Sequence, residues 1–261
     1  MELEIAIILT LLGLFGTIVN TMIGGGGGAI FIPILILLFD LSPSNAIATS
    51  FVAVAVGAVA STFAYSRQGT IDYRAGLVLG LLTLPGAFIG AFVTDLVPAR
   101  AFNSILGFVI ICFALFVWFK RHPQAATIAH ANTGAKKELD YVVNRRVAYP
   151  FAVLTGFFAG TFGAGGGLIA TPAMVLAGFP IHVAVGTSRL ITLILSIGAS
   201  TTRVSLGQAE LGYTAWLSAG SVCGAFIGAR VVRLMNSRTL TRLVTFLIIA
   251  LGVALVVDSL L

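Results

Sequence analysis

Apolar segments separated by short polar breaks run along the whole chain. They predict helices at residues 4–23, 28–39, 44–66, 73–95, 100–119, 148–162, 167–178, 183–204, 212–230 and 240–257. A helix needs roughly 20 residues to cross a bilayer, so the segments at 28–39 and 167–178 are too short to cross alone. The pattern predicts an all-α polytopic membrane protein. No basic region or cleavage pattern precedes the first segment, so we expect a retained helix rather than a signal peptide.

The two groups of five segments form an internal repeat. Residues 24–28 match residues 163–167, and Pro33 matches Pro172, at an offset of 139. The string GAFIGA at 86–91 recurs at 224–229, at an offset of 138. A nearly constant offset over most of each half is not expected from chance matches. We therefore predict two transmembrane repeats, 1–119 and 148–261, joined by a linker at 120–147.

Composition narrows the class of protein. Of 261 residues, 58% are hydrophobic and only 9% are charged, whereas soluble domains carry about 25% charged residues. This excludes a soluble enzyme and a disordered protein. Both cysteines lie within apolar segments, so a disulfide scaffold has no support. The net charge of +6 lies in the breaks between segments, which is typical of membrane topology signals rather than of a nucleic-acid partner.

The basic residues indicate how the repeats are oriented. The linker at 120–147 carries six Lys or Arg residues against two acidic ones, which places it in the cytoplasm. The break at 230–242 carries four arginines and no acid, whereas its match at 95–100 has one charge of each sign. Breaks at equivalent positions of the two repeats thus differ in their excess of basic residues, so we expect them on opposite sides of the membrane. This predicts repeats of inverted topology with both termini outside. The linker is either a tether held near anionic lipid, which we favour, or a regulatory docking site.

A glycine run opens the short second segment of each repeat. Glycine is poor helix, so these runs predict broken or re-entrant helices, which membranes tolerate only where protein or a wet cavity covers them. Paired breaks in inverted repeats are typical of secondary transporters, with the binding site near the midplane. The start of each short helix would offer N–H groups to an anion, although close helix packing is the alternative. The candidate substrate ligands are Gly25, Gly26, Gly27, Gly28, Gly165, Gly166 and Gly167.

Hydroxyl residues recur near the start of the third segment of each repeat. Thr49 and Ser50 match Thr187 and Ser188 at an offset of 138. They are candidate hydrogen-bond donors to an oxyanion, but Ser and Thr also join membrane helices by hydrogen bonds. Helix packing is the simpler explanation for the other polar residues within apolar segments: Asn20, Thr21, Ser61, Thr62, Ser200, Thr201 and Thr202.

Arg189 is the most informative single residue. It lies about seven residues into its segment, roughly 10 Å along a helix. Charged residues at membrane depth are rare and often functional, and a guanidinium suits an oxyanion through bidentate hydrogen bonds. The alternative is an arginine that extends to lipid phosphate. The matching residue is Phe51, so any charge would come from one half only.

The remaining charged residues support no catalytic or metal site. Asp72 and Glu210 match in the repeat and lie at segment edges, where caps of the following helices are favoured over proton carriers. The three histidines are scattered without a second ligand at metal-like spacing, so no metal and no cofactor is expected. A membrane enzyme or assembly subunit would need clustered His, Asp or Glu at depth, so this reading is disfavoured.

Together these motifs resemble the TauE/SafE sulfite exporter family. The resemblance rests on IGGGGGAIFIPIL and FGAGGGLIATPAM, on the Ala-Thr-Ser and Gly-Thr-Ser that follow them, and on the GAFIGA segments. It covers nearly the whole chain. It implies a permease of seven or eight spans without ATPase parts, located in the bacterial cytoplasmic (inner) membrane. Its implied substrates are sulfite, sulfonates and related organosulfur acids.

The sequence therefore favours a secondary transporter that exports a small sulfur-containing oxyanion. Each negative charge leaving an inside-negative cell gains about 2.3 kcal/mol per 100 mV. Import would need a coupled cation, for which no carboxylate cluster is evident. The expected partners are this anion and the lipid bilayer. The alternative is a channel for anions or small solutes that uses the same glycine-rich constriction.

Overall fold

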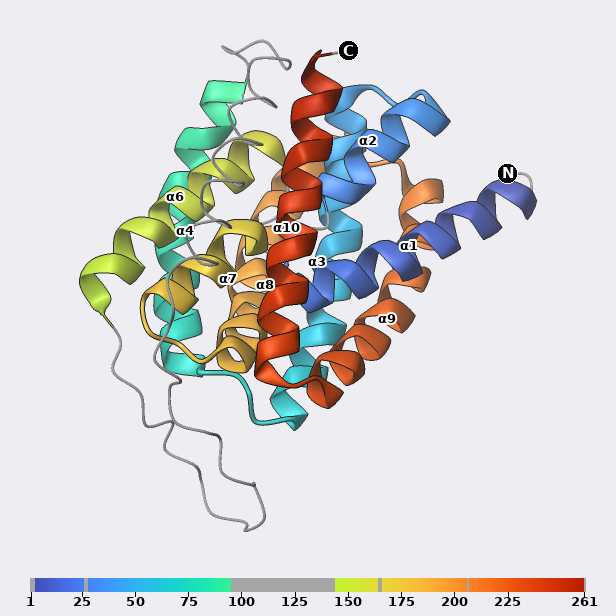
Figure 1. Ribbon diagram of the computed structural model, residues 1–261. Coiled ribbons are helices and arrows are strands. Elements are labelled where there is room, and N and C mark those ends of the chain that lie inside the picture. Colours follow the sequence, from blue (N-terminus) through green and yellow to red (C-terminus); the bar gives the residue numbers. More distant parts are fainter. Residues whose placement is uncertain (1–2, 26–27, 95–143, 164–165, 206, 261) are drawn as a thin grey trace.

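The part of the chain that the structure describes is entirely helical. This computed structural model describes residues 3–25, 28–94, 144–163, 166–205 and 207–260 (Figure 1). Within them, α1, α3, α4, α8 and α9 are long and apolar enough to cross a membrane. The helices are α1 (Leu3–Ile23), α2 (Gly28–Phe39), α3 (Pro43–Arg67), α4 (Tyr73–Thr94), α6 (Arg145–Phe162), α7 (Gly167–Leu176), α8 (Ile181–Ser205), α9 (Leu211–Leu234) and α10 (Ser237–Leu260).

Nine of the ten predicted segments coincide with these helices to within a few residues. The chain leaves the helix between α1 and α2 and between α6 and α7, where the glycine runs lie. The remaining predicted segment, 100–119, and most of the linker lie outside the described residues. Apolar length was therefore a good guide to where each described helix begins and ends.

Local sequence explains several helix ends. Ser42 precedes Pro43 at the start of α3, and its side chain accepts a hydrogen bond from the Asn45 N–H at 3.3 Å. Asp72 caps α4 as expected, because its carboxylate accepts from the Ala75 N–H at 2.9 Å. Gly163 ends α6 in the left-handed conformation at φ 62°, which costs glycine little. The carboxylate of Glu210 instead accepts from the Asn45 side chain at 3.3 Å and does not cap α9.

Two helix pairs are held by contact between backbones. In α4 and α6, the glycines are Gly86, Gly90, Gly156 and Gly160, and a Cβ on any of them would collide with the facing backbone. In α1 and α9, glycines such as Gly220 have the same role. The repeated GAFIGA string therefore packs α4 against α6 and α9 against α1. Figure 1 shows these pairs on opposite sides of the bundle. Small residues permit this close approach in lipid, where no hydrophobic force drives helices together.

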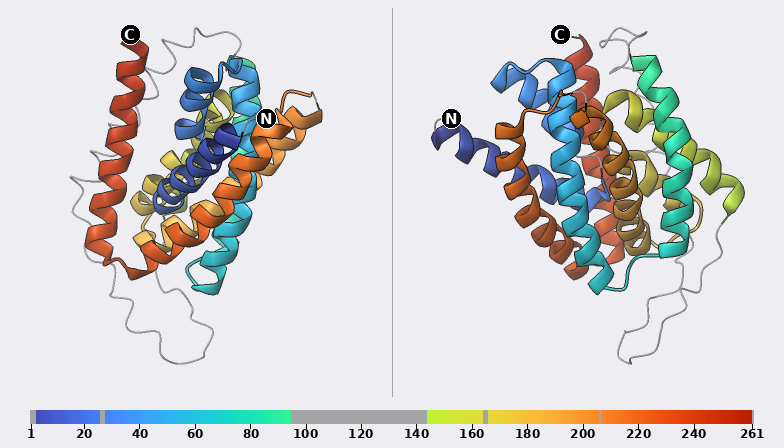
Figure 2. Two further views of the ribbon diagram at one scale, coloured as in Figure 1. Left: turned by 90° about the vertical axis from the view of Figure 1, so that its right-hand side faces the viewer. Right: turned by 180° about the vertical axis from the view of Figure 1, so that it is seen from behind.

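The two long helices α3 and α8 lie between these pairs. α3 packs on α9 and α8, and α8 packs on α4 and α7. They run antiparallel, because Arg189 contacts Ser61 whereas Arg203, further along α8, lies over the ring of Phe51, which is earlier in α3. The last helix, α10, lies along one side of the bundle (Figure 2). Most residues of α3 and α8 are thus placed in the interior.

The backbone contact between α4 and α6 can be tested with one methyl group. We expect Gly156→Ala to destabilise the protein by about 1–3 kcal/mol or more, because its Cβ would meet the Thr83 carbonyl of α4. The measurement is the melting temperature in detergent. Gly198→Ala is the matched control, because its Cβ would meet only Leu84 Cδ2 at 3.6 Å. Equal melting temperatures for the two variants would contradict this account of the helix pair.

Candidate functional site

The two glycine breaks touch each other inside the bundle. Gly24 and Gly25 have φ of 93° and 131°, a backbone conformation that glycine adopts readily. A Cβ on Gly25 would lie 2.9 Å from Cα of Gly167, the first residue of α7. The face of Gly167 on which a side chain would project is in turn filled by the Gly25 backbone. Glycine is therefore needed on both sides of this contact.

Each break also lies against the short helix of the other half. A Cβ on Gly24 would collide with the Thr171 hydroxyl of α7, and a Cβ on Gly163 would lie 2.9 Å from Ile32 of α2. Among the other predicted glycines, Gly28 opens α2 and Gly166 precedes α7. Gly26, Gly27 and Gly165 lie outside the described residues.

Thr49 and Thr187 join the two halves of the chain. The Thr49 hydroxyl accepts a hydrogen bond from the Glu210 N–H at 3.2 Å, just before α9. The Thr187 hydroxyl accepts from the Asp72 N–H at 3.0 Å, just before α4. Each threonine of one half thus holds the start of a helix of the other half. Their role as donors to a solute stays a prediction.

The two matching serines have different surroundings. The Ser188 hydroxyl pairs with the Thr171 hydroxyl at 2.7 Å and also donates to the Ala184 carbonyl. The Ser50 hydroxyl is buried and has no hydrogen-bond partner among the described residues. One difference lies in the short helices, where Ile32 occupies the position in α2 that Thr171 occupies in α7.

Arg189 is completely buried in the interior. It lies eight residues after the start of α8, about 12 Å along the axis, and is 0% exposed. Its Nε donates to the Ser61 hydroxyl at 2.7 Å, and Ser61 donates to the Gly57 carbonyl at 2.8 Å. Both Nη atoms lack a hydrogen-bond partner within the described residues. The alternative of an arginine extending to lipid phosphate is wrong, because the side chain points into the protein.

Tyr65 connects this arginine to the first glycine break. It lies one turn after Ser61 on α3 and is close enough to Arg189 to interact with it electrostatically. Its hydroxyl donates to the Thr21 carbonyl at 2.9 Å, in the last turn of α1. That turn also ends at the break, since the Gly25 N–H donates to the Asn20 carbonyl at 2.8 Å. Arg189 therefore faces the region where α1 ends.

Buried polar atoms without a partner gather on three helices that pack together. Apart from Arg189, every such side chain found among the described residues belongs to α1, α3 or α9. We call these side chains the α1–α3–α9 polar group: Thr17, Asn20, Thr21, Ser50, Thr62, Ser218 and Ser221. On the opposite side, hydroxyls such as those of Thr83 and Thr155 donate to carbonyls of their own helix. Among the described residues, the buried side-chain polar atoms without a partner, apart from those of Arg189, thus lie on one side of the interior, which we call its polar side.

Sequence reasoning found only part of this arrangement. It identified Arg189 but attributed Asn20, Ser61 and their polar neighbours to helix packing, and it missed Thr17, Tyr65, Ser218 and Ser221. A signal was available in α3, where Ser50, Gly57, Ser61 and Tyr65 share one helical face. A Cβ on Gly57 would lie within 3.3 Å of the side chains of Thr17 and Ser221, so this face meets α1 and α9.

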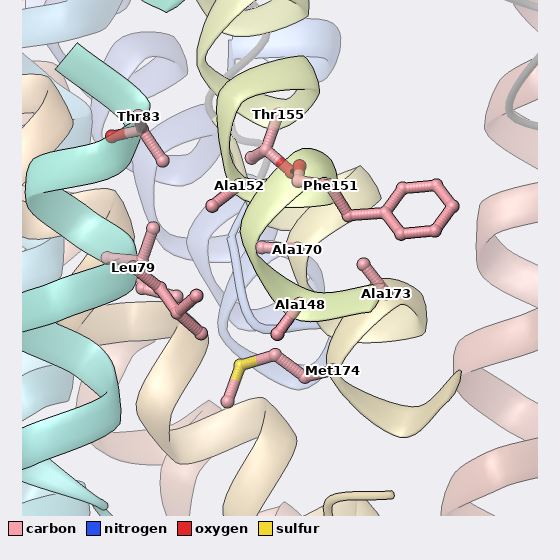
Figure 3. Close-up of a pocket in the computed structure, with 10 residues that line it drawn as sticks. Leu79, Thr83, Ala148, Phe151, Ala152, Thr155, Ala170, Ala173 and Met174 are labelled. Carbon is pink, nitrogen blue, oxygen red and sulfur yellow. Dashed lines mark hydrogen bonds between the residues drawn. The ribbon is translucent and has the colours of Figure 1, made fainter. Parts of the chain in front are cut away.

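A small apolar cavity lies on the other side, between α4, α6, α7 and α8 (Figure 3). Its lining includes Leu79, Ala152, Ala170 and Met174, and the ring of Phe151 points away from it. In the first half, Phe31 stands at the position matching Ala170 and is fully buried against Gly16. The larger side chain fills the equivalent space there, so this cavity reflects divergence of the two halves.

Comparison with known proteins identifies the relatives of this chain. The family model described as "Sulfite exporter TauE/SafE" matches residues 9–255. A probable membrane transporter protein, YunE of Bacillus subtilis, is 31% identical over 97% of this chain and 98% of its own length. The probable membrane transporter protein YfcA of Escherichia coli is 24% identical over 91% of this chain and 84% of its own. No solved structure matches.

The unpaired nitrogens of Arg189 predict an effect on stability. A buried cation without full pairing is costly, so Arg189→Met should raise the melting temperature in detergent, while Ser61 keeps its bond to Gly57. Arg203→Met is the control, because Arg203 bonds Gln208 and lies over Phe51 and should not gain stability when truncated. A lower melting temperature for Arg189→Met would make this arginine a structural residue.

Proposed function

The chain belongs to the TauE/SafE sulfite exporter family of membrane transporters, and on this premise we propose that Arg189 binds a small sulfur-containing oxyanion during secondary transport. Sulfite and organosulfonates are the proposed substrates, and export across the cytoplasmic membrane is the proposed direction. The observation that carries the proposal is a fully buried guanidinium whose two Nη atoms have no partner among the described residues.

The orientation of the guanidinium suits this substrate class. Because Ser61 holds Nε, the edge formed by Nη1 and Nη2 remains available. Two oxygens of a sulfite or sulfonate group can accept two parallel hydrogen bonds from such an edge. A third oxygen would accept from a donor such as the Asn20 amide, which is buried and without a partner in the described chain. The glycine breaks would let the anion approach backbone N–H groups.

We further propose that the chain is built from two inverted repeats, 1–119 and 148–261, with the linker at 120–147 in the cytoplasm. Three contacts support this symmetry. The pair α1 and α9 matches the pair α6 and α4, α3 runs antiparallel to α8, and each glycine break lies on the short helix of the other half. Movement of one half against the other would then open the central site to each side in turn.

Tracer exchange in proteoliposomes tests the binding role of Arg189. Vesicles hold unlabelled methanesulfonate at zero membrane potential, and labelled methanesulfonate is added outside. We expect saturable uptake, inhibited by sulfite but not by dimethyl sulfone, a neutral molecule of similar shape. Arg189→Met should lower uptake at least about 100-fold, because two charge-assisted hydrogen bonds are lost.

Arg67→Met is the matched control, because Arg67 is exposed at the end of α3 and lies over the ring of Phe63. It should transport like the wild type. Unchanged uptake in Arg189→Met would remove Arg189 from the site, and absence of uptake for every sulfur oxyanion would refute the substrate class. Uptake that does not saturate would favour the channel alternative.

A second variant tests the polar side of the interior. We expect Asn20→Ala to raise the KM for methanesulfonate roughly 10-fold, because a hydrogen bond to a charged partner is lost. Asn45→Ala is the control, since the Asn45 amide bonds the Glu210 carboxylate away from the interior. An unchanged KM together with an altered melting temperature would leave Asn20 a structural role only.

A further inference from the structure

The positive charge of Arg189 has no fixed counter-ion within the apolar segments. None of the nine carboxylates in the sequence falls inside one of them; all lie at segment ends or in the linker: Glu2, Glu4, Asp40, Asp72, Asp95, Glu138, Asp140, Glu210 and Asp258. Of those that the structure describes, Asp72 caps α4 and Glu210 is exposed before α9. Within the described residues, the guanidinium donates to the neutral Ser61 hydroxyl, and the neutral Tyr65 side chain lies close enough to interact with it. The bound anion would therefore supply the missing charge.

The lack of a fixed counter-ion should make the rate of conformational change depend on whether an anion is bound. To expose the site on the other side, the protein passes through a state in which Arg189 is sealed from water on both sides. An unpaired cation in such an environment is strongly disfavoured, whereas an ion pair is much less so. The change of conformation should thus be fast with anion bound and slow without it.

We propose that the protein is an anion exchanger, in which an anion of the same class must bind on the opposite side before the site returns. This inference rests on the proposed function. The counter-substrate is a second small oxyanion able to accept hydrogen bonds from both Nη atoms of Arg189. Exchange of anions of equal charge moves no net charge, so the concentrations of the two anions, and not the membrane potential, set the net direction.

The test compares two sets of wild-type proteoliposomes that differ only in their contents. One set holds unlabelled methanesulfonate, and the other holds gluconate of equal ionic strength. We expect uptake of labelled methanesulfonate to be at least about ten-fold faster into the first set. An imposed potential of either sign should leave the exchange rate unchanged, because no net charge crosses.

Arg189→Met separates this mechanism from a general effect of the internal anion. Any residual uptake by this variant should be equally fast into both sets of vesicles, whereas Arg67→Met should keep the wild-type ratio. Equal wild-type uptake into both sets would overturn the exchange mechanism and leave the proposed function intact. No uptake into either set would overturn the proposed function itself, and the exchange inference with it.

Discussion

Backbone contact at glycine is the constraint on which the arrangement of this bundle depends. Helices in lipid gain little from burying apolar side chains, so α1 with α9 and α4 with α6 associate by close approach. Each pair combines a helix of the first half with a helix of the second. The α3 and α8 helices are thereby held between the pairs, and most of the residues that they carry are buried.

The same two helix pairs carry different side chains at positions that match in the sequence. Thr17 and Thr21 of α1 stand at the positions that match Gly156 and Gly160 of α6, so the α1–α9 pair brings hydroxyls into a contact that α4 and α6 make with glycine alone. Phe51 stands at the position matching Arg189. These side chains can differ because the glycine contacts between the helix backbones are kept in both pairs. A single cation, Arg189, then faces the polar side.

Most of the fold could be predicted because apolar length and glycine runs are local signals. Contacts between distant segments cannot be recognised from such local patterns in the sequence. Arg189 and Ser61 are 128 residues apart, and no periodicity connects them. Thr49 and Thr187 were predicted to face a solute, yet their surroundings depend on where the following helices of the other half begin. Membrane depth made Arg189 a candidate functional residue, but it did not show which neighbours orient its side chain.

The distribution of satisfied and unsatisfied polar groups distinguishes packing from function. A hydroxyl in a membrane helix has a local acceptor in the carbonyls of its own preceding turn, and burying it costs little where it donates to one, as Thr155 and Thr161 do. A guanidinium and a carboxamide cannot satisfy all their hydrogen-bonding groups on the carbonyls of their own helix. Arg189 and Asn20 are both buried in the interior with unpaired polar atoms among the described residues. Random divergence would scatter such costs over the bundle. Their concentration on one side, beside the contact between the two glycine breaks, supports the binding site proposed for this region.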